Sequence, residues 1–139
     1  MRILRSLAAV VVAVLMTTGL LAVSTVGASA AETWTVKTKL KPVATGPLDY
    51  VLKGRVLHRA DDGTVDDVYQ RGVVKIQKKA CKRCSWKVEK RDRTSRRGTF
   101  RTKVHGPSRS GTTWRWRAMV PAGDGYARSF SKAWSIASS

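Results

Sequence analysis

Hydrophobic and polar residues alternate along most of the chain beyond residue 33, so that apolar side chains recur at every second position. In the first such run, Trp34, Val36 and Leu40 alternate with threonine and lysine. Period-two alternation bounded by turn residues is typical of a strand with one buried face. The pattern predicts seven strands, within residues 34–40, 50–57, 73–77, 86–89, 100–104, 114–120 and 130–136.

Glycine, proline and aspartate gather between these runs, and no long segment has the period of a helix. Seven short strands in about 100 residues are typical of an immunoglobulin-like (Ig-like) β-sandwich. We therefore expect an all-β domain, with an OB-type or other small barrel as the alternative. In the immunoglobulin arrangement, the first, second, fourth and fifth strands share one sheet. The alternation turns most of the five tryptophans toward the core, together with Val88 and Phe130.

The order of short motifs along the chain resembles the Ig-like or fibronectin-III-like modules of secreted actinobacterial proteins. In such modules a glycine-valine strand precedes a tryptophan strand and a glycine-aromatic strand in the same order. The resemblance extends from Gly54 to Ser131 and implies fold and secretion, with no defined ligand. It is carried by Gly54-Arg55-Val56, Gly72-Val73-Val74-Lys75-Ile76-Gln77, Trp86-Lys87-Val88, Gly98-Thr99-Phe100, Trp116-Arg117-Ala118, Tyr126 and Ser129-Phe130-Ser131.

The N-terminal 30 residues have the order of a secretory signal peptide. Arg2 and Arg5 precede an uncharged apolar run over residues 7–23, and small residues follow, with cleavage fitting equally well after Ala30 or Ala31. An uncleaved membrane anchor is the alternative, although the run is short for a span. We expect residues 1–30 to be removed and residues 31–139 to form one secreted domain without a transmembrane span.

The charge of the mature chain indicates an anionic partner. The 27 basic residues include the two of the signal peptide, so the mature chain keeps 25 against 9 acidic residues, a net charge of +16. Such a charge predicts association with polyanions and no particular fold. Outside the cell, we expect the partner to be a cell-wall polymer, a polysaccharide or extracellular DNA, with the protein secreted and retained at the envelope.

The alternation of the predicted strands gathers many of these cations on one sheet. In the sheet that holds segments 34–40, 50–57, 86–89 and 100–104, the outward positions are nearly all Lys or Arg, whereas the opposite sheet offers only Lys75, Arg115 and Arg117. Like charges on adjacent strands repel, so we interpret the first face as a docking surface. With two cations of the turn before residue 86, its predicted residues are Lys37, Lys39, Lys41, Lys53, Arg55, Lys82, Arg83, Lys87, Arg101 and Lys103.

The only cysteines, Cys81 and Cys84, lie between two predicted strands. A redox Cys-x-x-Cys site needs a helix N-terminus, which this segment lacks. A zinc site needs two more ligands, and strand directions put His58 and His105 at opposite ends of the sandwich. Export instead favours a disulfide, which would pin the turn and hold Lys82 and Arg83 outward.

Catalytic motifs are not found in the sequence, and we expect a non-enzymatic protein without a cofactor. The acidic segment Asp61–Asp67 is open to two interpretations, a calcium-binding loop or a solvated turn. The tryptophans fall on inward positions, which disfavours specific nucleic-acid readout by exposed aromatic residues. The alternative function is that of a cationic antimicrobial or inhibitor protein, acting on anionic membranes or on an acidic enzyme.

Overall fold

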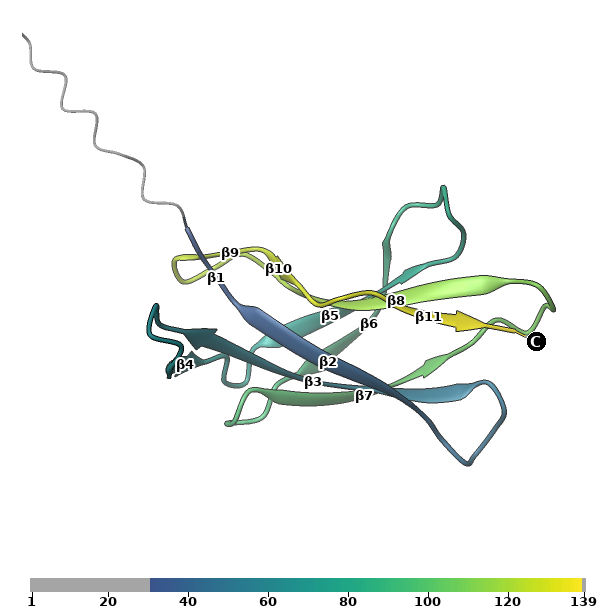
Figure 1. Ribbon diagram of the computed structural model, residues 1–139, viewed down its shortest axis with the longest axis horizontal. Coiled ribbons are helices and arrows are strands. Elements are labelled where there is room, and N and C mark those ends of the chain that lie inside the picture. Colours follow the sequence, from purple (N-terminus) through teal and green to yellow (C-terminus); the bar gives the residue numbers. More distant parts are fainter. Residues whose placement is uncertain (1–30, 139) are drawn as a thin grey trace, which may run out of the picture.

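The computed structural model describes residues 31–138, and within this range all regular secondary structure is β (Figure 1). The all-β prediction is therefore confirmed. The predicted signal peptide lies outside the described residues. Residues 31–138 contain no helix that is long and apolar enough to cross a membrane.

The strands form two principal antiparallel sheets. In the first sheet the long strand β3 is central and pairs with β2, β4 and β7; in the second, β8 and β5 are central and β6 forms one edge. The first sheet contains β2 (Thr35–Pro42), β3 (Asp49–Arg59), β4 (Val65–Val68) and β7 (Thr99–His105). The second contains β5 (Val73–Lys79), β6 (Lys87–Arg93), β8 (Thr113–Val120), β10 (Ser129–Phe130) and β11 (Trp134–Ala137). A short parallel pair joins β1 (Glu32–Thr33) to β9 (Tyr126–Ala127).

The two sheets enclose one hydrophobic core. Leu52 and Val56 of β3 face Val74 and Ile76 of β5, and all four side chains are fully buried. On each strand these residues alternate with outward ones, and the inward side chains of the two sheets pack together to form the core of the sandwich. Trp116 completes the core and donates its indole N–H to the His105 carbonyl at 3.1 Å.

The prediction that segment 86–89 shares a sheet with segment 100–104 is wrong. This segment begins β6, which pairs with β5 and not with β7. A short connection between consecutive strands favours their direct pairing, and here the connection is the turn that holds both cysteines. At the edge of the sandwich, Asp92 of β6 accepts a hydrogen bond from the Thr102 hydroxyl at 2.8 Å.

The inward placement of Trp86, Val88 and Phe130 is also wrong. Ile76 lies opposite Lys90 and Gln77 opposite Val88, so that Glu89 is an extra residue of β6, and the register shift leaves Val88 40% exposed. Trp86, just before β6, does not belong to the residues that pack in or against the core. Ser129 of β10 and Ser131 just after it, on either side of Phe130, are buried, and Phe130 itself is 43% exposed. The serine hydroxyls accept hydrogen bonds from buried backbone N–H groups, which explains why they occupy the inner positions.

Candidate functional site

Seven cations of the first sheet project from its outer side and form what we call the basic face. The register of the three strands places them in cross-strand rows, and neighbouring strands are about 4.8 Å apart. The central row holds three cations side by side, Lys39, Lys53 and Arg101. The complete basic face consists of Lys37, Lys39 and Lys41 of β2, Lys53 and Arg55 of β3, and Arg101 and Lys103 of β7.

Alternation within each strand accounts for this gathering of charge. In β7, Phe100, Thr102 and Val104 are buried, whereas the residues between them are exposed. In the middle of β3 the same parity holds, where Lys53 and Arg55 are exposed and Leu52 and Val56 are buried, whereas Val51 and Leu57 on the outward side are buried as well. Because the register pairs outward positions with outward positions, three separate local patterns add up to one charged surface.

None of the seven cations forms an ion pair with a carboxylate among residues 31–138. The ion pairs of the described residues lie elsewhere, at His58, at Lys78 and at His105. Asp92, whose carboxylate contacts β7, accepts hydrogen bonds from the Thr102 hydroxyl and the Arg101 backbone N–H. The positive charge of the basic face is therefore not neutralised by the protein's own carboxylates.

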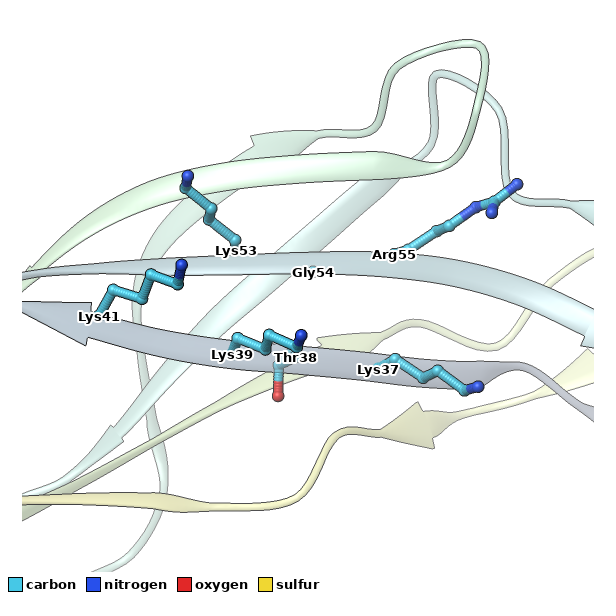
Figure 2. Close-up of a pocket in the computed structure, with 7 residues that line it drawn as sticks. All are labelled: Lys37, Thr38, Lys39, Lys41, Lys53, Gly54 and Arg55. Atoms are coloured by element: carbon cyan, nitrogen blue, oxygen red, sulfur yellow. The ribbon is translucent and has the colours of Figure 1, made fainter.

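Five of these cations line an open depression of about 320 Å³ between β2 and β3. Figure 2 shows Lys37, Lys39 and Lys41 leaving β2 on one side, while Thr38 points the opposite way. The main chain of Gly54 lies between Lys53 and Arg55 (Figure 2). Long aliphatic stems keep the charged ends in water, so the surface can exchange its counterions for a ligand.

Arg55 is the one member of the basic face whose position is fixed by a hydrogen bond of its own side chain. Its Nε donates to the Arg97 carbonyl in the β6–β7 turn at 3.1 Å. The bond leaves the two Nη groups free of described partners, and it brings the exposed Arg97 to the end of the face. The fixed guanidinium is suited to bind a phosphate or carboxylate group in two-point fashion.

Three of the ten predicted binding residues lie away from this face. Lys82 and Arg83 are exposed in the β5–β6 turn, and Lys87 begins β6 opposite Lys78. Figure 1 shows this hairpin projecting from the second sheet on the side away from β2, β3 and β7. The prediction that these three residues extend the basic face is therefore wrong, because β6 pairs with β5 in the second sheet.

The predicted disulfide between Cys81 and Cys84 is confirmed. Their Cα atoms are 5.0 Å apart, and the Cys84 backbone N–H donates to the Cys81 carbonyl at 3.2 Å. The two bonds close a tight turn between β5 and β6. Lys82 and Arg83, at the middle of this turn, are exposed as expected.

The acidic segment 61–67 uses several of its carboxylates in internal hydrogen bonds. Asp66 bonds the His58 ring at 2.7 Å, and Asp67 accepts from the Tyr126 hydroxyl at 3.0 Å. Asp62 accepts from the hydroxyl and the backbone N–H of Thr64, and these bonds lower its pKa. Within the described residues no three His, Cys, Asp or Glu side chains are grouped to hold a metal ion.

The two histidines lie at opposite ends of β3, as the strand count predicted. His58 belongs to the end of β3, whereas His105 lies opposite Asp49 at its start and bonds that carboxylate at 2.7 Å. The separation along β3 is nine residues, about 30 Å for an extended strand. The histidines therefore cannot join the cysteines in one zinc site.

Comparison of the chain with protein families, with curated proteins and with solved structures gives no match. Function is therefore inferred from the surfaces themselves. One of these surfaces was not predicted from the sequence: Arg117 was expected to point outward with few cationic neighbours, and no binding role was assigned to it. The aromatic rings that flank Arg117 belong to Trp86 and Phe130, which the alternation of the sequence wrongly placed in the core.

Proposed function

We propose that the protein is exported and that its mature domain binds anionic polymers of the cell envelope through the basic face. The observation that carries this proposal is the set of seven cations on one sheet, none with an ion pair to a described carboxylate. Repulsion between such neighbours costs stability. A bound polyanion would neutralise these charges and remove the repulsion, so binding explains why so many cations share one surface.

An extended polymer suits the geometry better than a compact anion. Outward residues along one strand are about 6.6 Å apart, so Lys37, Lys39 and Lys41 offer three positions along a line. The outward cations of the neighbouring strands β3 and β7 broaden this line into a band. Each exposed contact is weak and screened by salt, and affinity arises from many contacts made together.

The protein is proposed to act without catalysis, as a non-enzymatic module of Ig-like or fibronectin-III-like type. The pairing of β6 with β5 supports this type, because variable-type Ig domains add a C′ strand to the sheet that contains strand C. The N-terminal charge, apolar run and small residues support export. Retention at the envelope would follow from charge alone.

The test compares two variants of equal net charge for retention on cell wall purified from the source organism, eluted with a sodium chloride gradient. We expect the basic-face variant to elute at much lower salt and the control variant to elute near the unchanged protein. Equal loss in both would show that net charge alone acts and would refute the basic face as the site. The basic-face variant replaces Lys37, Lys39, Lys53, Arg101 and Lys103 with serine, and the control replaces Lys79, Arg91, Arg109, Arg115 and Arg128.

Dye-loaded vesicles of anionic lipid, treated with the same two variants, address the alternative function. Envelope binding predicts retention on cell wall without release of dye. Dye release by the unchanged protein, lost in the basic-face variant, would instead assign the surface to attack on membranes.

A further inference from the structure

The guanidinium of Arg117 is held between two aromatic rings on the outer side of the second sheet. Its Cζ atom lies 4.2 Å from the centre of the Trp86 ring and 4.0 Å from that of Phe130. Trp86 directly precedes β6, Arg117 belongs to β8, and Phe130 ends β10. The stack therefore joins three segments of the chain and lies on the sheet opposite to the basic face.

A hydrogen bond at Nε also fixes the Arg117 side chain. Arg117 Nε donates to Gln77 Oε1 at 2.8 Å, across the β5–β8 pair. Its Nη groups have no hydrogen-bond or ion-pair partner among residues 31–138. Partial burial lowers the pKa of Arg117, but an arginine stays protonated in proteins. The result is a charged fork with fixed position and a free outer edge.

Apolar side chains surround this fork. Val88 lies in the same cross-strand row as Gln77 and Arg117, and Met119 lies beside Phe130 in the next row. Val88 and Phe130 are two of the three large hydrophobic residues exposed in the described part of the chain. A ligand that carried only charge would gain nothing from them.

The rim of this surface is basic. Lys75 and Arg91 lie in the row of Met119, and Arg115 lies two residues before Arg117. None of these three has an ion pair with a described carboxylate. A second copy of this strongly basic chain would be repelled, whereas an acidic partner would be attracted.

We propose that this surface, the Arg117 site (Gln77, Trp86, Val88, Arg117, Met119 and Phe130), docks an acidic protein partner. A partner carboxylate binds the free Nη edge of Arg117 in two-point fashion, and an adjacent apolar side chain packs on Phe130 and Val88. Protein interfaces are usually enriched in tryptophan, arginine, phenylalanine and methionine at the centre and carry charged residues at the rim, and the Arg117 site has this composition. Because the fork is already fixed, binding loses little side-chain entropy.

The probe is a short peptide, acetyl-Glu-Leu-Glu-Leu-Glu-amide, titrated into the ¹⁵N-labelled mature protein, with the glutamine-for-glutamate peptide as its control. We expect the acidic peptide to shift the Arg117 Nε–H and Trp86 indole N–H signals, and the control peptide to leave them in place. Arg117→Lys keeps the charge but loses the fork, so the affinity should fall about tenfold. Lys39→Ser on the basic face is the matched control and should bind the peptide normally.

Shifts confined to the basic face, equal binding of both peptides, or unchanged binding by Arg117→Lys would each overturn the Arg117 site. Association with anionic lipid vesicles would be seen as quenching of Trp86 fluorescence. If the protein binds these vesicles more tightly than the acidic peptide, and Arg117→Lys binds them equally well, the surface would be assigned to lipid instead. If Arg117→Lys does not fold, Phe130→Ser provides the same test. Cell-wall retention of these variants should equal that of the unchanged protein, so the failure of either proposal can be told from failure of the other.

Discussion

Gly54 of β3 lies opposite Phe100 of β7, and the Phe100 ring occupies the space that a side chain at residue 54 would need. A Cβ atom at this position would overlap the Phe100 ring and lie 2.9 Å from the Lys37 carbonyl oxygen. The glycine therefore lets an aromatic ring cross the central strand of the sheet that carries the basic face.

Replacement of Gly54 with alanine is expected to destabilise the domain by about 1–3 kcal/mol, because the added carbon overpacks a rigid core. Urea unfolding followed by tryptophan fluorescence measures the loss. Gly123→Ala is the control, since a Cβ there would meet no atom within 4 Å, and it should change the unfolding free energy by less than about 0.5 kcal/mol. Equal effects of the two substitutions would contradict this account of Gly54.

Lys53 lies between Lys39 and Arg101 in the central row of the basic face. Lys53→Glu should replace two repulsions with two attractions and raise the unfolding free energy by about 0.2–1 kcal/mol at low salt. The gain should largely vanish in 1 M sodium chloride, where the screening length is about 3 Å. Arg128→Glu alters the net charge equally and serves as the control; a similar gain there would mean that only total charge is felt.

The Ser129 hydroxyl accepts a hydrogen bond from the buried Trp34 backbone N–H at 2.9 Å. Ser129→Ala would leave this donor without a partner, at a cost of about 1–3 kcal/mol. Thermal and urea unfolding should both show the loss, and Ser135→Ala at an exposed position of β11 should show almost none. A neutral Ser129→Ala would mean that Trp34 finds another acceptor.

The pKa of Tyr126 makes the stability of the domain depend on pH in the alkaline range. Partial burial and the hydrogen bond to Asp67 raise the pKa of Tyr126 to about 12 from 10.0. The folded state thus keeps the phenol proton between these values while the unfolded state releases it, so stability should fall as pH rises through this window. The fall should be smaller in Tyr126→Phe, and phenolate absorbance of the folded protein gives the pKa directly; identical pH profiles of the two proteins would refute this linkage.

The sequence by itself determined the β class, the turn disulfide and most of the basic face. These features follow from local rules. Parity along a strand decides whether Lys53 or Leu52 faces water, and the predicted export together with a spacing of three residues is what favoured a disulfide between Cys81 and Cys84. Once the backbone register of β2, β3 and β7 aligns inward positions with inward positions, their seven cations share the other side of the sheet.

The tertiary structure alone decided the sheet to which β6 belongs, the outward turn of Phe130 and the neighbours of Arg117. The partner of a strand is a non-local choice, and a single bulged residue reverses the facing of everything beyond it. Hydrophobicity placed Trp86 and Phe130 inside, but the bulge and the buried hydrogen bonds of the adjacent serines turned them outward. The stack around Arg117 exists only because three separate segments of the chain, which hold Trp86, Arg117 and Phe130, meet at one place on the second sheet.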